Sequence, residues 1–197
     1  MTMKIINSIA SILIVCSLFS CKKETYKTRY DELLPKNSGI VTAFLNGKEW
    51  KSDICLTNYF RALEKVDTID FTARVFENGY ERQQLSISMI NLLSPLQKIE
   101  PTIHYDSVNK RYYLRNVDGC NSAFFPIDVD VPENVYSVYE NESTKSYVKI
   151  EEYNFDTKKV KGSFEAHYTR FSRQAPLTQG LPDTLHFTSG KFEFQLK

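Results

Sequence analysis

The side chains best suited to acid–base or metal chemistry are few in this sequence of 197 residues. Its three histidines, His104, His167 and His186, stand far apart in the chain, and none lies in a His-Glu-x-x-His or Gly-x-Ser-x-Gly motif. A hydrolase is an alternative only if one of them contacts a carboxylate in a cleft. We therefore predict no catalytic residue, no metal ligand and no cofactor, in a protein that is not an enzyme.

Carboxylates alternate in one further segment, where Asp128, Asp130 and Glu133 flank Pro132. The segment lacks the glycine and the ligand spacing of an EF-hand calcium loop, and the proline stiffens it. We expect a solvated acidic loop here rather than a calcium site.

The cysteine with the clearest chemistry is Cys21. An uncharged stretch from Ile5 to Phe19 precedes it and Lys22-Lys23 follows, which is the layout of a signal peptide. The stretch is shorter than the roughly 18 to 20 apolar residues of a membrane-spanning helix. Leu18-Phe19-Ser20-Cys21 resembles a lipobox, which implies cleavage before Cys21 and a diacylglycerol on its thiol. Acyl chains of this kind hold a protein on a membrane without a spanning segment.

This reading divides the chain into a signal peptide (1–20), a lipidated cysteine with a flexible polar tether (21–37) and one β domain (38–197). Removal of residues 1–20 takes away Lys4 alone, so the formal net charge falls from +1 to zero. A neutral chain lacks the basic stripe that nucleic-acid binding requires, so we expect no nucleic-acid partner.

Two cysteines, Cys55 and Cys120, remain in the predicted domain. An exported protein permits disulfides, and a bridge across this loop would stabilise the fold by about 4 kcal/mol. The alternative, two free and buried thiols, is equally compatible with the sequence, since a domain of this size does not need a disulfide to be stable.

Alternating apolar and polar residues begin at Gly39 and indicate strands rather than helices. Asn46-Gly47 predicts a type I′ hairpin in which Leu45 faces Lys48 and Ala43 faces Trp50, a core anchor. Further predicted strands are 70–76, 84–90, 111–116, 147–153, 160–171 and 191–196. The proline- and glycine-broken segments 94–101 and 116–134 are expected to be loops. The expected fold is all-β, a single antiparallel sandwich or distorted barrel, with a lipocalin-like closed barrel as the alternative.

Three short motifs give a resemblance to a known group of proteins. They are Val41-x-Ala43-x-x-Asn46-Gly47-Lys48-x-Trp50, Val160-x-Gly162-Ser163-Phe164 and Ser189-Gly190-Lys191-Phe192. Together they resemble uncharacterised lipoproteins of Bacteroidota. The resemblance implies the outer membrane of a Gram-negative envelope and supplies no catalytic residues. Lys22-Lys23-Glu24 offers one acidic residue after the cysteine, so the periplasmic and outer faces both stay open.

A second resemblance is to the Asp-Ser/Thr-aliphatic sequon that carries O-glycans on exported proteins of the same group. It fits Asp67-Thr68-Ile69, Asp106-Ser107-Val108 and Asp183-Thr184-Leu185. The resemblance implies Thr68, Ser107 and Thr184 as acceptors, while the alternative is that these pairs are ordinary turn or strand-entry residues.

Aromatic residues crowd the middle third of the chain, and five tyrosines there are candidate ligand contacts: Tyr105, Tyr112, Tyr113, Tyr136 and Tyr139. Exposed tyrosines stack on sugars or line partner interfaces, whereas buried ones fill a core. We expect a membrane-anchored binding or structural module of the envelope, whose partner is a glycan or an envelope protein. The alternative is a lipocalin-like carrier of a small apolar ligand.

Overall fold

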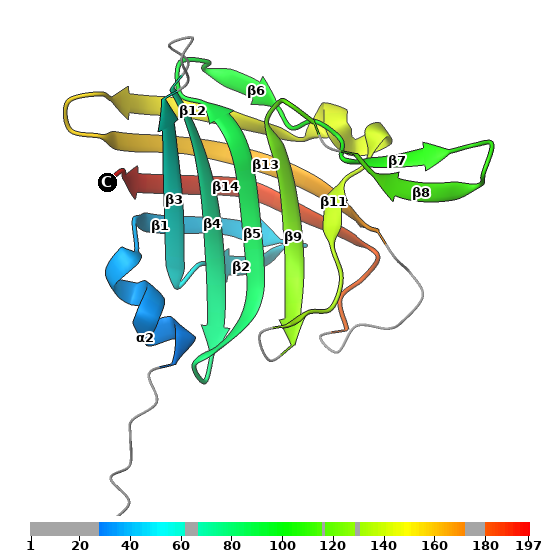
Figure 1. Ribbon diagram of the computed structural model, residues 1–197, viewed down its shortest axis with the longest axis horizontal. Helices are drawn as coiled ribbons and strands as arrows, with labels where there is room; N and C mark the ends of the chain where they lie inside the picture. The colour runs from blue at the N-terminus through cyan, green and yellow to red at the C-terminus, as the bar shows by residue number, and fades with distance from the viewer. Residues whose placement is uncertain (1–27, 62–66, 116, 129–130, 172–179) are drawn as a thin grey trace, which may run out of the picture.

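The computed structural model describes residues 28–61, 67–115, 117–128, 131–171 and 180–197 (Figure 1). The predicted signal peptide, Cys21 and the first part of the tether lie outside these residues. One short helix, α2 (Arg29–Leu33), and a 3-10 turn, η1 (Leu34–Lys36), precede the strands. The strands are β1 (Gly39–Leu45), β2 (Lys48–Lys51), β3 (Ile54–Arg61), β4 (Asp67–Glu77), β5 (Tyr80–Asn91), β6 (Leu96–Lys98), β7 (Ile103–Asp106), β8 (Arg111–Leu114), β9 (Asn121–Asp128), β10 (Val131–Pro132), β11 (Tyr136–Val138), β12 (Tyr147–Asn154), β13 (Lys159–Arg170) and β14 (Thr184–Gln195), with a 3-10 helix, η2 (Glu140–Lys145), before β12.

Twelve of the strands form one antiparallel sheet with the path β2-β1-β14-β13-β11-β9-β5-β4-β3. Strands β12 and β6 extend it from β13, and β7 and β8 form a separate two-stranded sheet. The sheet bends so that β3, β4, β5 and β9 cross the strands from β1 to β12 at a steep angle (Figure 1). The all-β, single antiparallel fold is confirmed. The closed-barrel alternative is wrong, because the path ends at β2 and β3, and these two strands do not pair.

The core lies between the two halves of this bent sheet. The Phe71 ring of β4 has its centroid 5.1 Å from that of Phe194, 5.5 Å from Phe192 and 6.4 Å from Phe164, all on β13 and β14. Trp50 is buried, as predicted for a core anchor, and its ring packs edge-on against that of Phe187. Aromatic rings therefore occupy the space that a carrier of apolar ligands would hold open.

The predicted hairpin at the start of the domain is confirmed in its turn and its register. Asn46 and Gly47 both have positive φ, at 49° and 79°, which a type I′ turn requires. Leu45 pairs with Lys48 and Ala43 pairs with Trp50.

The two glycine motifs of β13 and β14 face each other and interlock. Gly162 pairs with Phe192, and Phe164 pairs with Gly190. A Cβ on Gly162 would lie 2.3 Å from Phe192 Cζ, and one on Gly190 would lie 2.5 Å from Phe164 Cε1. Each glycine thus leaves room for the phenylalanine across from it, an arrangement known to stabilise glycines in strands.

Two segments predicted as loops contain strands. The short strand β6 lies within 94–101, and β9, a central strand, lies within 116–134. Pro126 interrupts the pattern but fits β9, because its carbonyl accepts from Glu133 N on the side away from β5. Its missing N–H points the same way, so the β5–β9 ladder loses no hydrogen bond there.

The predicted tether reaches too far into the chain, since residues 28–37 pack on the domain. Thr28 and Asp31 form a capping box for α2, and Tyr30 stacks edge-on with Phe76. Asn37 Oδ1 accepts from Cys55 N at 2.9 Å, and Ser38 N donates to Cys55 O at 2.8 Å, so this segment caps the first residues of edge strand β3. Among the described residues, no helix is long and apolar enough to cross a membrane.

Candidate functional site

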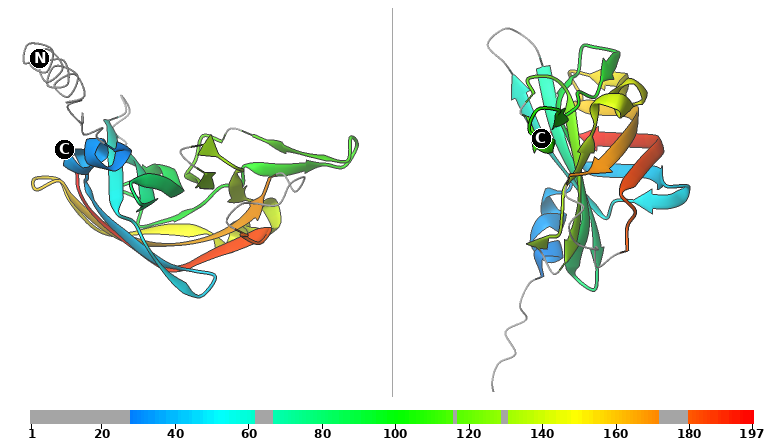
Figure 2. Two further views of the ribbon diagram at one scale, coloured as in Figure 1. Left: turned by 90° about the horizontal axis from the view of Figure 1, so that it is seen from below. Right: turned by 90° about the vertical axis from the view of Figure 1, so that its right-hand side faces the viewer.

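A two-stranded hairpin, β7–β8, stands apart from the main sheet and projects from the body (Figures 1 and 2). Ile103 of β7 forms a parallel bridge with Tyr139, and Arg115 N donates to Thr102 O at 2.9 Å just below the hairpin. An isolated two-stranded hairpin is marginal in water, so contacts at its base must hold it in place.

His104 supplies one of those contacts. Its Nδ1 lies 2.5 Å from Glu140 Oε1 of η2, its Nε2 lies 3.1 Å from Pro101 O, and its ring stacks on Tyr113. Both polar partners present acceptor oxygens, one beside each ring nitrogen. This histidine therefore ties the hairpin to the body.

A groove of about 470 Å³ runs between the base of the hairpin and the outer face of β9 and β11. We call it the hairpin groove. Its apolar lining comes from Leu114, Val117, Ala123, Phe125 and Val135, and its polar lining from Thr102, Arg115, Asn121 and Ser137. Thr102 and Ser137 bond to each other through their hydroxyls. Of the described residues that line the groove, Arg115 alone is charged.

The aromatic cluster predicted from the sequence divides between the core and this surface. Tyr136 is fully buried and its hydroxyl donates to Pro182 O at 2.7 Å, so its prediction as a ligand contact is wrong. Tyr113 is 42% exposed on the hairpin, and Tyr139 is half-buried beside it. Tyr105 and Tyr112 pair across β7 and β8, and their side chains lie outside the described set.

No family model, no curated protein and no solved structure matches this chain. The lipoprotein resemblance therefore stays a prediction, and the site has to be argued from its own geometry.

Sequence analysis missed the floor of the groove. Phe125 falls in the segment 116–134, predicted as a loop, and Val135 directly follows it. Phe124 and Phe125 nevertheless stand on opposite faces of β9, one buried in the core and the other half-buried over the groove. The alternation of Ser122, Phe124 and Pro126 against Ala123 and Phe125 is the signal that could have revealed this strand.

The other two histidines do not complete a catalytic group with His104. His167 and His186 are cross-strand neighbours on the outer face, with ring centroids 4.5 Å apart. His104 does contact a carboxylate, as the hydrolase alternative requires, but Pro101 O occupies its second nitrogen. Among the described residues, no group of three or more His, Cys, Asp or Glu side chains could hold a metal ion. Of the acidic segment, Asp130 lies outside those residues, and Asp128 forms an ion pair with Arg82 at 3.4 Å.

Cys55 and Cys120 are both free and buried. Cys55 is the second residue of edge strand β3, and Cys120 immediately precedes β9. Strands β4 and β5 therefore lie between the two cysteines in the sheet. Three strand spacings of about 4.8 Å give about 14 Å, whereas a disulfide needs Cα atoms within about 7 Å. The bridged alternative does not fit this sheet, and the two-thiol alternative does. Burial, together with Glu100 and Asp70, raises the pKa of Cys120 to about 12, and burial raises that of Cys55 further.

The three predicted glycan acceptors differ in their surroundings. Thr68 is only 8% exposed inside β4, which leaves no room for a sugar on the folded chain. Ser107 is exposed at the tip of the β7–β8 hairpin, where Asp106 Oδ1 accepts from Val108 N and Asn109 N. Thr184 is exposed at the start of β14. Glycosylation stays a prediction for Ser107 and Thr184.

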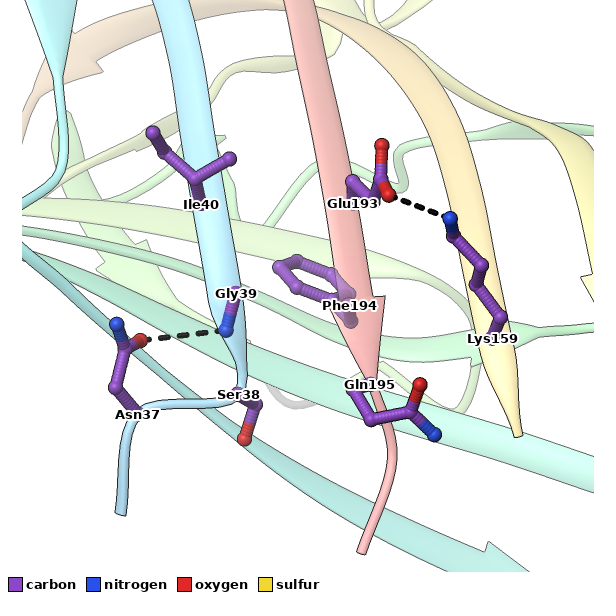
Figure 3. Close-up of a pocket in the computed structure, with 8 residues that line it drawn as sticks. All are labelled: Asn37, Ser38, Gly39, Ile40, Lys159, Glu193, Phe194 and Gln195. Atoms are coloured by element: carbon purple, nitrogen blue, oxygen red, sulfur yellow. Dashed lines mark hydrogen bonds and ion pairs between the residues drawn. The ribbon is translucent and has the colours of Figure 1, made fainter. Parts of the chain in front are cut away.

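A second hollow lies on the outer face, where β1, β14 and β13 begin or end (Figure 3). Lys159 Nζ and Glu193 Oε1 are 2.7 Å apart across one wall, and Gly39 N donates to Asn37 Oδ1 at the other. The ion pair raises the pKa of Lys159 and lowers that of Glu193. Because these charges satisfy each other, this hollow offers little to a charged ligand.

Proposed function

We propose that this protein is a lipid-anchored binding module of the cell envelope, held on the outer membrane through Cys21. Support for the anchor comes from the lipobox-like Leu18-Phe19-Ser20-Cys21 and the signal layout before it. The described fold begins at Thr28, soon after that cysteine. The residues between them can span about 20 to 25 Å when extended, so the domain would lie close to its membrane.

We further propose that the hairpin groove is the recognition surface, and that it binds a segment of an envelope protein. The observation that carries this proposal is a projecting hairpin over a mostly apolar groove. Leu114 and Tyr113 are 49% and 42% exposed on that hairpin, and Val108 at its tip is 87% exposed. Tyr113 and Leu114 are consecutive in β8 and point to its opposite faces, so Leu114 is the exposed apolar side chain that faces the groove.

The chemistry of the groove favours a protein segment over a glycan. Its floor of Ala123, Phe125 and Val135 suits apolar side chains, and most of its lining lacks the polar groups that sugar hydroxyls need. No carboxylate of the described residues forms an ion pair with Arg115, which can therefore pair with an acidic group of the partner. The expected partner segment is apolar with one acidic residue.

The site is tested by charge insertion at matched positions. Leu114→Asp places a carboxylate in the groove. The control, Leu34→Asp, places a carboxylate outside the groove, in η1 on the far side of the domain, at a position of similar exposure, 46%. We expect one envelope protein to cross-link to the wild type and to Leu34→Asp, and at least tenfold less to Leu114→Asp. Equal capture by both variants, or capture blocked by soluble glycans, contradicts the proposal.

The anchor is tested separately by Cys21→Ser. We expect the variant to remain folded and to leave the membrane fraction for the soluble fraction, because no acyl chain can then attach. Membrane fractionation of the variant equal to that of the wild type would show that the anchor lies elsewhere.

A further inference from the structure

A larger groove, independent of the proposed partner site, lies at the edge of the sheet formed by β6. Its volume is about 720 Å³, and it is lined by Pro95, Leu96, Lys98, Thr144, Ser146, Tyr147 and Lys149. We call it the β6 groove. Leu96 and the nearby Leu93 are 62% and 64% exposed, the highest values for any leucine of the described residues.

The register of β6 and β12 sets how the lining side chains are arranged. Leu96 pairs with Lys149 and Lys98 pairs with Tyr147. The flanking bonds, Ile150 N to Pro95 O and Ile99 N to Ser146 O, make both pairs of the non-hydrogen-bonded kind, in which side chains approach most closely. The groove thus presents two apolar side chains on one diagonal and two lysines on the other.

Neither Lys98 nor Lys149 forms an ion pair with a described residue. Two carboxylates stand near Lys149 on the β13 side of β12: Glu151 accepts from Ser163, which pairs with Lys149, and Glu165 lies opposite Tyr147, where its charge adds to the effect of burial in raising the pKa of that tyrosine. Diagonal neighbours in a sheet are about 7 to 8 Å apart, so the two long lysine side chains can reach one anion between them.

We propose that the β6 groove binds a single acyl chain that carries a carboxylate, with the chain along Leu96, Pro95 and Tyr147 and the carboxylate between Lys98 and Lys149. Apolar surface alone would accept any chain, whereas the paired lysines select the charge of the head group. Thr144 lines the same groove, and its exposed hydroxyl offers a further hydrogen bond to the head.

The ligand test compares head groups and needs no substitution in the groove. The protein carries Cys21→Ser, which removes the predicted anchor and changes no described residue. Laurate, dodecyltrimethylammonium and acetate are titrated by calorimetry below the micelle-forming concentrations of the two amphiphiles. We expect saturable binding of laurate, binding of the cationic chain at least tenfold weaker, and no binding of acetate. Equal affinity for the two chains, or no saturable binding of laurate, overturns the proposal.

The site test uses charge-matched variants. Lys98→Gln with Lys149→Gln removes the two groove charges, and Lys48→Gln with Lys51→Gln removes two exposed charges from β2. The first pair should raise the dissociation constant for laurate about tenfold or more, and the second should leave it unchanged. Leu96→Asp should abolish binding while thermal unfolding shows a folded protein. Equal weakening by both lysine pairs would mean general charge attraction and would overturn the assignment of the site.

Discussion

Gly162→Ala tests the interlocked strands β13 and β14 most directly. The added Cβ would lie 2.3 Å from Phe192 Cζ and 2.4 Å from the backbone oxygen of Lys149. Phe192 is 3% exposed and packs against Phe71 and Phe194, so its ring has no free space to enter. The oxygen belongs to β12, so relief there requires a shift of a whole strand.

Overpacking of this kind costs about 1 to 3 kcal/mol, and two simultaneous clashes place the cost at the upper end. Replacing glycine by alanine within a strand returns about 0.5 to 1 kcal/mol through the unfolded state. We therefore expect the free energy of unfolding to fall by about 2 kcal/mol. For a domain of this size, that corresponds to a Tm lower by about 4 to 8 °C.

The assay is urea and thermal unfolding followed by circular dichroism, with Gly119→Ala as control. A Cβ at Gly119 meets only Glu100 Cγ, at 3.1 Å, on a side chain that can move, so a change within about 0.5 kcal/mol is expected. Adding Phe192→Leu to Gly162→Ala should cost less than the sum of the single changes, because the smaller side chain removes one of the clashes. A Gly162→Ala protein as stable as the wild type would refute the Gly162–Phe192 register.

Three further predictions concern the thiols, the tyrosines and the edge cap. Cys55 and Cys120 should be unreactive toward a thiol reagent in the native protein and fully reactive in urea without a reductant; persistent protection in urea would indicate a disulfide. Burial raises the pKa of Tyr136 to about 12, against about 10 when unfolded, and it raises the pKa of Tyr153, Tyr168 and both cysteines as well, so unfolding in urea should become easier at alkaline pH. Each group contributes up to about 1.4 kcal/mol per pH unit above its unfolded pKa, so Tyr136→Phe should reduce the slope by up to that amount between about pH 10 and 12. Asn37→Ala should lower stability by about 1 to 2 kcal/mol, and the exposed Asn58→Ala by under 0.5 kcal/mol, in the same assay.

Local patterns in the sequence predict the fold class and most of the strands. The Asn46-Gly47 turn determines its own register, because both residues accept positive φ and a two-residue loop leaves one pairing. Alternation over Val160–Tyr168 likewise identifies which face of β13 is buried.

The missed elements depend on contacts that are distant in the chain. Strand β9 contains Pro126, and only the position of β5 shows that its missing N–H costs the β5–β9 ladder nothing. The hairpin groove requires β7–β8 to lie over β9 and β11, and the β6 groove requires β6 to pair with β12, some 50 residues later. Composition could not separate Tyr136 in the core from Tyr113 on the hairpin, because both lie in the aromatic-rich middle third of the chain.

The segment that caps β3 also determines how the chain can be shortened. A protein that began at Gly39 would keep every strand. However, the backbone N–H and C=O of Cys55, which now bond to Asn37 and Ser38, would lose their partners at the edge of the sheet. Exposed strand edges pair readily with other chains. Truncation there would expose a template for self-association that worsens with concentration, whereas a start at residue 28 keeps this end of the β3 edge covered.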